Sequence, residues 1–154
     1  MTGDNDLLEI VAVQQTIYRY SDAVTRGDWE QYASVFAPDC VWDVLNPVPM
    51  HAVGPEAITA FMREMIDQME FFLQMSHNMV VDIVGPGRAT SMTTIHEMAR
   101  NADTIDGQIT GVYQDELAKQ DDGVWRFTSR RFSCTYFENA HLAGVTVTPR
   151  SELP

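Results

Sequence analysis

One histidine stands out in the segment FFLQMSHNMVVDIV, residues 71–84, because most of its neighbours are apolar. The segment alternates with the two-residue period of a β-strand, which places Met75, His77 and Met79 on one face. That face is the more apolar one, so we expect His77 to point into the interior. An imidazole with a pKa of about 6.5 can accept and return a proton. His77 is therefore a candidate general base, and the alternative is a hydrogen-bonded structural histidine.

The same alternation turns other polar side chains inward. One later strand places Asp115 beside Tyr113, and the last places Arg130 beside Phe132 and Cys134. Burying an ionisable group without a partner costs several kcal/mol, so these groups must pair with one another or with a ligand. The two interpretations are a structural ion pair between Asp115 and Arg130 and a polar site for a bound molecule.

Composition and charge limit the class of protein. The 154 residues carry a formal charge of -12, which disfavours nucleic acid and anionic membranes as partners. Cys40 and Cys134 lack metal-ligand spacing, and no glycine-rich phosphate loop follows a strand, so we expect neither a metal nor another cofactor. The N-terminus resembles no signal peptide and no apolar run is long enough to span a membrane, so we expect a cytoplasmic protein.

The elements predict a single α+β domain over residues 1–154. Apolar residues at intervals of three and four predict a helix from Leu7 to Val24. Gly27 and Asp28 then end it and begin a short second helix that Pro38 closes. The remaining elements are a strand at 40–45, a helix at 54–69, and strands at about 71–84, 88–100, 108–119 and 124–137. We expect the helices to pack on one face of a curved, mostly antiparallel sheet that encloses a pocket.

Two long stretches resemble one family. YRYSDAVTRGDWEQYASVFAPDCVWD and GVYQDELAKQDDGVWRFTSRR resemble SnoaL-like proteins of the NTF2-like superfamily, and the similarity covers nearly the whole chain. The resemblance implies a cone-shaped α+β barrel with an apolar pocket between the sheet and the helices. It also implies a homodimer or homotrimer that packs through the outer face of the sheet. The same fold carries isomerases, dehydratases, cyclases, epoxide hydrolases and binding domains, so it does not define the function.

Within the superfamily, DGVWRF and CTYFENAHLAG are most similar to the branch of scytalone dehydratase and hexachlorocyclohexane dehydrochlorinase. In those enzymes a strand histidine abstracts a proton and an aspartate late in the first helix orients it. The resemblance implies that His77 is this base and that Arg130 holds a leaving group. Thr25 stands where the orienting aspartate is expected. Either Glu97 or Asp115 then serves the histidine, or the pair is absent.

A second resemblance concerns hydrogen-bond donors. By its spacing to GDW, Tyr20 is similar to the oxyanion-hole tyrosine of ketosteroid isomerase, and Asp115 is similar to the protonated aspartate of that enzyme. The general-base aspartate of that isomerase would fall near Val44, with Asp43 one residue away, so isomerase chemistry of that kind is disfavoured. Glu97 shares a strand face with Ile95, which also directs it inward.

We therefore expect a cofactor-independent lyase or isomerase that acts on a small, largely apolar cyclic or aromatic substrate by histidine-mediated proton transfer. The expected catalytic residues are His77, Tyr20, Asp115 and Arg130. The expected substrate-binding residues are Val24, Thr25, Trp42, Glu97, Tyr113, Phe132 and Cys134. The alternative is a non-catalytic domain of the same fold that binds a small hydrophobic ligand or a partner. In such a domain the inward polar groups would satisfy one another and no proton would need to move.

Overall fold

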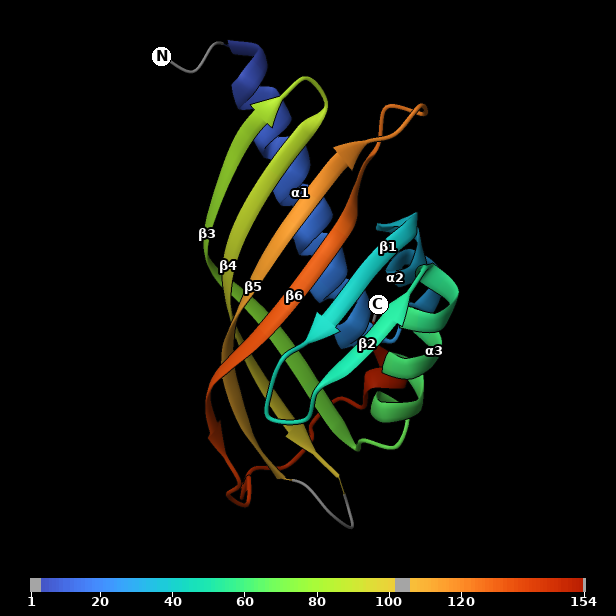
Figure 1. Ribbon diagram of the computed structural model, residues 1–154. Coiled ribbons are helices and arrows are strands. Elements are labelled where there is room, and N and C mark those ends of the chain that lie inside the picture. Colours follow the sequence, from blue (N-terminus) through green and yellow to red (C-terminus); the bar gives the residue numbers. More distant parts are fainter. Residues whose placement is uncertain (1–3, 102–105, 154) are drawn as a thin grey trace.

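The computed structural model describes residues 4–101 and 106–153, with side chains from residue 6 onward (Figure 1). Its helices and strands are, in chain order, α1 (Asp4–Arg26), α2 (Trp29–Ser34), β1 (Phe36–Val44), β2 (Met50–Val53), α3 (Pro55–Ile66), β3 (Phe71–Gly85), β4 (Arg88–Arg100), β5 (Asp106–Lys119), β6 (Trp125–Glu138) and the short 3-10 helix η1 (Arg150–Glu152). Among the described helices, none combines the length and the apolar character that crossing a membrane requires.

The six strands form one curved sheet in the order β2-β1-β6-β5-β4-β3. All neighbouring strands are antiparallel except β1 and β6, which run parallel. The helix α1 runs along one face of the long strands, and α2 and α3 lie at the end where β1 and β2 extend the sheet (Figure 1). The predicted α+β class, with three helices on a mostly antiparallel sheet, is confirmed. The sheet stays open rather than closing into a barrel, because β2 and β3 are its two edges.

The helix α1 forms because one side of it is apolar. Val13, Ile17, Tyr20 and Val24 recur at helical spacing and are all fully buried against the sheet. The helix ends before Gly27, whose φ of 72° is a left-handed conformation that glycine adopts without strain. The next residue, Asp28, then accepts a hydrogen bond from the backbone N–H of residue 31 at 3.0 Å and begins α2, as its type and position predict.

The strand β2 (Met50–Val53) was not predicted, because the stretch between Leu45 and Gly54 reads as irregular in the sequence, and several element boundaries also differ from the prediction. The strand β1 begins at Phe36 rather than at residue 40, so Pro38 lies inside a strand and does not end the preceding helix. Proline is tolerated there because β1 pairs with β6 at Phe36 and again from Val41, with the ladder interrupted between them. The helix α3 ends at Ile66, three residues before the predicted end at Met69.

The strand β3 contains an irregularity that decides which side chains reach the interior. Ser76 pairs with Ile95 of β4, and the next paired residue, Met79, is opposite Thr93. Residues 77–78 therefore lie opposite a single residue of β4, which is the geometry of a β-bulge.

The bulge reverses the alternation along β3. Before it, the even-numbered Phe72 and Gln74 are buried. After it, the odd-numbered Met79, Val81 and Ile83 pack partly against the core. A two-residue period counted through the whole strand therefore assigns the wrong face to every residue on one side of the bulge.

A glycine in β5 permits close packing against β6. A Cβ atom at Gly111 would lie 2.4 Å from the ring of Phe132 and 2.7 Å from the carbonyl oxygen of Ser133. We predict that Gly111→Ala lowers the free energy of unfolding by about 1–3 kcal/mol, because neither the buried ring nor the strand can move away easily. Gly85→Ala is the matched control, since a Cβ there meets nothing within 4 Å. Urea denaturation measures both variants, and equal losses would contradict the packing explanation.

Candidate functional site

The centre of the interior is the guanidinium group of Arg130, which β6 places in complete burial. Its central carbon lies 3.7 Å from the ring centroid of Tyr113, 3.9 Å from that of Tyr20 and 4.3 Å from that of Phe127. A desolvated cation over an aromatic face gains on the order of 2 kcal/mol. Because Tyr113 comes from β5 and Tyr20 from α1, helix and sheet meet at this charge. The predicted inward direction of Arg130 is found.

Asp115 of β5 carries the negative charge that pairs with Arg130. Its Oδ1 atom lies 3.6 Å from Nε of Arg130, which is within ion-pair range but too long for a hydrogen bond. Its Oδ2 atom accepts a hydrogen bond from Ser91 at 3.1 Å. Burial raises the pKa of Asp115 to about 6, although Arg130 and Ser91 both act to lower it. The carboxyl is therefore mostly ionised at neutral pH and compensates the charge of Arg130.

Several buried hydrogen-bond donors of the interior have no acceptor. Within the described part of the chain, none of the three guanidinium nitrogens of Arg130 has a hydrogen-bond partner, and neither has Nε1 of Trp42. Trp42 in β1 is the direct register neighbour of Arg130 in β6. Each buried N–H without an acceptor costs about 1–3 kcal/mol. An oxygen or halogen atom of a bound molecule would satisfy these donors.

The two tyrosines whose rings cover the guanidinium form a hydrogen-bonded cluster with a third. The hydroxyl oxygens of Tyr20 and Tyr113 are 3.0 Å apart, and the hydroxyl of Tyr32 donates to that of Tyr20 at 3.5 Å. Burial raises the pKa of all three phenols, so they stay neutral and can donate hydrogen bonds. Sequence reasoning missed Tyr32, because α2 has only six residues and shows too little periodicity to identify its buried side.

A second polar group lies where the last turns of α1 meet β3 and β4. Glu97 of β4 faces the interior, as predicted, and its Oε1 accepts a hydrogen bond from Nε2 of Gln74 in β3. Oε1 of Gln74 accepts a hydrogen bond from Ser21 of α1 at 3.2 Å. Burial raises the pKa of Glu97, while Gln74 and then Arg130 act to lower it. Sequence reasoning missed Gln74 because the bulge in β3 reverses the face to which it was assigned.

The prediction that His77 faces the interior is wrong. Its side chain is exposed on the outer face of the sheet, and its ring centroid lies 6.2 Å from that of His96 with the two rings nearly parallel. The physical reason is the bulge at residues 77–78, which returns this side chain to the outer face. His77 cannot take a proton from a molecule held between the sheet and α1.

The remaining predicted substrate-binding residues have different surroundings. Three of them lie in the buried core: Val24, Trp42 and Phe132. The hydroxyl of Thr25 accepts a hydrogen bond from the backbone N–H of Gln74 at 3.1 Å, so it satisfies the free edge of β3. Cys134 is half-buried, and burial raises the pKa of its thiol, which keeps the thiolate rare.

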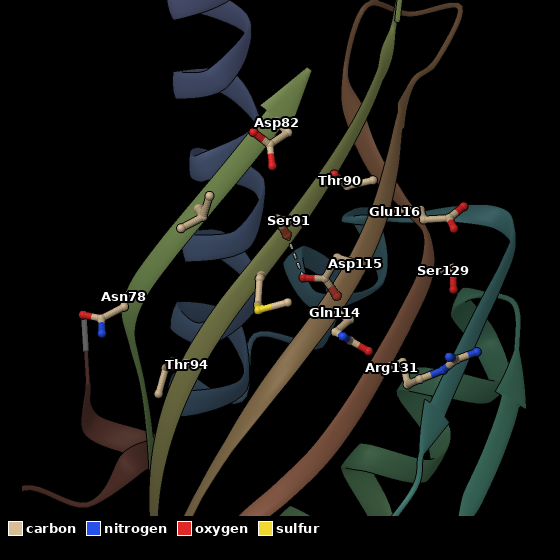
Figure 2. Close-up of a pocket in the computed structure, with 12 residues that line it drawn as sticks. Asn78, Asp82, Thr90, Ser91, Thr94, Gln114, Asp115, Glu116, Ser129 and Arg131 are labelled. Carbon is tan, nitrogen blue, oxygen red and sulfur yellow. Dashed lines mark hydrogen bonds between the residues drawn. The ribbon is translucent and has the colours of Figure 1, made fainter. Parts of the chain in front are cut away.

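A hollow of about 640 Å³ lies on the other face of the sheet (Figure 2). Figure 2 shows that its lining comes from the four long strands β3 to β6. Arg131 lies at one side of it and has no hydrogen bond or ion pair to any described residue, while Asp82 and Glu116 lie elsewhere along its lining. Val80 and Met92, also in the lining, are 61% and 52% exposed. This face therefore combines apolar surface with charges of both signs.

The described side chains form no cluster suited to a metal ion. In residues 4–101 and 106–153, no group of three or more histidine, cysteine, aspartate or glutamate side chains could hold a metal ion. Two surface histidines each contact one acid: His51 lies 2.7 Å from Asp43, and His141 lies 2.5 Å from Asp106. A pair of this kind supplies two ligands at most, fewer than the three or four protein ligands that zinc uses.

An open α+β sheet with helices on one face and ionisable groups between the two layers defines an NTF2-like fold. The model of the SnoaL-like domain family matches residues 5–131, so the chain belongs to this family. None of the curated proteins matches the sequence.

Solved structures share the fold at low sequence identity. A protein named "Putative Scytalone Dehydratase" from Novosphingobium aromaticivorans is 24% identical with a TM-score of 0.78, over 90% of this chain and 92% of that one. A hexachlorocyclohexane dehydrochlorinase from Novosphingobium barchaimii is 21% identical with a TM-score of 0.79, over 93% of this chain and 96% of that one. A protein of Streptomyces coelicolor, ActVI-ORFA, is 16% identical with a TM-score of 0.68, over 82% of this chain and 96% of that one. At these identities the likeness shows the fold, and the scytalone dehydratase and dehydrochlorinase branch is the one that the sequence predicts.

The raised pKa of Asp115 predicts how stability depends on pH. The carboxyl titrates near 3.8 when the chain is unfolded and near 6 when it is folded. Between these values the folded protein binds the proton more tightly, so this group makes the free energy of unfolding fall as pH rises from about 4 to about 6. We expect this fall to be shallower in Asp115→Asn. Asp82→Asn, which alters an exposed carboxyl, should keep the wild-type slope in urea denaturation, and identical slopes in the two variants would refute the assignment.

Proposed function

We propose that the chain is a cofactor-independent lyase or isomerase that acts by proton transfer on a small, largely apolar cyclic or aromatic molecule. The observation that carries this proposal is an interior that holds both the carboxyl group of Glu97 and a buried guanidinium whose nitrogen atoms lack acceptors. Relatives of the same fold include proteins named for a dehydratase and a dehydrochlorinase, and both of these names denote elimination reactions. The proposal differs from the sequence prediction in its base, which is Glu97 instead of His77.

Glu97 has the properties that a proton-transfer group needs. Burial raises its pKa, which makes its carboxylate a stronger base than an exposed one. Its Oε1 is held by Gln74, whereas its Oε2 has no hydrogen bond to any described residue. This second oxygen would take the proton from a carbon atom of the substrate.

Arg130 and Tyr20 would stabilise the negative charge that develops during the reaction. In an elimination, the electron pair of the broken C–H bond forms the double bond, and the leaving group departs with the electrons of its own bond. Arg130 would hold this departing anion or a substrate oxygen, since its nitrogen atoms lack acceptors. Tyr20, kept neutral by its raised pKa, would donate a hydrogen bond to developing negative charge. Asp115 is mostly ionised at neutral pH, so we assign it to positioning Arg130 rather than to donating a hydrogen bond.

The exposure of the side chains indicates from which end of the interior a substrate would enter. Arg130, Tyr20 and Tyr113 are buried, whereas Glu97 and Thr25 are half-buried. A substrate would therefore enter at the end of the interior where α1 terminates, and its leaving group would point toward Arg130. Core residues such as Trp42 would exclude water and strengthen the electrostatic interactions around the substrate.

One observation favours a second candidate function, a domain that binds a small apolar ligand without converting it. The three tyrosine hydroxyls bond to one another, and Arg130 is covered by three rings, so much of the interior is satisfied within the protein. In a binding domain Glu97 would serve only to contact the ligand. Replacing it would then change affinity and would have no reaction to affect.

We further propose that the outer face of the sheet packs against a second copy of the chain, in a homodimer or homotrimer. The exposed side chains of Val80 and Met92 supply apolar area, and Arg131 shares the face with acids of opposite charge. A surface that carries both charges can be complementary to itself when two copies face each other.

Substitution of Glu97 tests the catalytic role. We expect Glu97→Gln to lower the rate of water or halide loss from cyclic β-hydroxyketones or β-haloketones by about 10² to 10⁴. Glu97→Asp should retain part of the rate, and His77→Ala should keep all of it, because that ring lies outside the interior. A rate for Glu97→Gln equal to that of the wild type would eliminate Glu97 as the base. If the wild type binds these ketones without converting them and Glu97→Gln binds them more weakly, the result would favour the binding domain.

Reversal of one charge tests the assembly. We expect Arg131→Glu to reduce the molar mass measured by size-exclusion chromatography with light scattering, because it replaces the arginine of this face with a further acid. Arg88→Glu changes an exposed arginine at the turn between β3 and β4 and is the control for net charge. A monomeric wild type, or an unchanged mass for Arg131→Glu, would contradict the proposed interface.

A further inference from the structure

The contact between α1 and the free edge of β3 holds a chain of polar side chains. Because β3 is an edge strand, the backbone of Gln74 is free on the side that faces α1. The hydroxyl of Thr25 accepts a hydrogen bond from the backbone N–H of Gln74 at 3.1 Å and donates one to the backbone carbonyl oxygen of Gln74 at 3.4 Å. Thr25 thereby fixes the backbone position of Gln74, and its hydroxyl is occupied by this role.

The side chain of Gln74 has only one orientation that satisfies its neighbours. The single proton of the Ser21 hydroxyl is donated to Oε1 of Gln74, so in the 2.6 Å contact between Ser21 and Ser76 the donor is Ser76. The amide then presents Nε2 to Glu97. A flipped amide would place its oxygen against the Glu97 carboxylate and lose the hydrogen bond to it. Every donor in the chain from Ser76 to Glu97 therefore points toward the carboxylate.

This chain occupies the place where the sequence predicts a proton-transfer pair. The residue of β3 that lies beside Thr25 and faces the interior is Gln74, and neither side chain can titrate. The titratable group of the region is on the neighbouring strand, at Glu97, one hydrogen bond away. Ser21 and Gln74 are both buried, so water competes poorly for these hydrogen bonds.

We propose that Gln74 is a positioning residue that holds the Glu97 carboxyl for proton transfer, with Ser21 of α1 holding Gln74 in turn. This inference rests on the proposed function, in which Glu97 is the base. The role of Gln74 is to fix Oε1 and so to direct Oε2, which has no partner in the described chain, toward the substrate. The amide also stabilises the ionised carboxyl by donating to it, which opposes the effect of burial.

Gln74→Leu tests this role, because leucine has a similar size but cannot donate. The first measurement is a carbon-detected NMR titration of the Glu97 carboxyl, assigned by its absence in Glu97→Gln. We expect the pKa of Glu97 to rise by about 1 unit or more in Gln74→Leu, because a hydrogen bond to the charged form is lost. Ser21→Ala should raise the pKa of Glu97 by less, since this variant removes the hydrogen bond that holds the Gln74 amide but keeps the amide itself. Gln108→Leu is the matched control, because that amide contacts His96 on the outer face.

The second measurement is the pH profile of deuterium incorporation into cyclohexanone in D₂O. The rising limb of the profile, which follows ionisation of the base, should move to higher pH in Gln74→Leu in parallel with the titration of Glu97. An unchanged titration of Glu97 in a folded Gln74→Leu variant, with Ser21→Ala also unchanged, would overturn the proposal. If the wild type exchanges no deuterium while Gln74→Leu still shifts the titration, the proposed function fails but the placement of Glu97 by Gln74 stands.

Discussion

The positive charge of Arg130 inside the protein is the constraint on which the rest of the interior depends. An ionised group removed from water carries a penalty of several kcal/mol unless other groups replace its hydration. Here the replacement comes from the rings of Tyr20, Tyr113 and Phe127 and from the carboxylate of Asp115. These groups belong to α1, β5 and β6, so compensating one charge requires the helix and the sheet to be assembled together.

The same constraint gives the interior its chemical character. The rings and one carboxylate stabilise the guanidinium electrostatically, but they leave its hydrogen-bonding directions unused. A site that is stable in its charge but short of acceptors is suited to bind an atom that becomes negative during a reaction. The raised pKa of Glu97 follows from the same burial, because desolvation penalises the charged form of a carboxyl group. One buried layer therefore favours both a group that accepts a proton and a group that holds an anion.

The β-bulge in β3 determines which of its side chains reach each face of the sheet. It places Gln74 inside, where it contacts Glu97, and it leaves His77 outside, next to His96. Because the side chains of a strand alternate, the long strands present one set of side chains to the interior and another to the outer face. A shift of one residue in the pairing of β3 would exchange these sets, so the bulge decides which side chains of β3 line the interior.

Local patterns in the sequence determined the types of the long elements, the α+β class, the buried face of α1 and the inward direction of Asp115, Arg130 and Glu97, but they did not reveal the short strand β2. These follow from periods of 3.6 and 2 that each segment carries by itself. Tertiary structure alone decided that His77 is outside, because a bulge depends on how two strands pair and leaves no mark in a two-residue alternation. It also decided that Gln74, Ser21 and Glu97 meet, since residues so far apart in the chain come together only when α1 packs across the edge of β3.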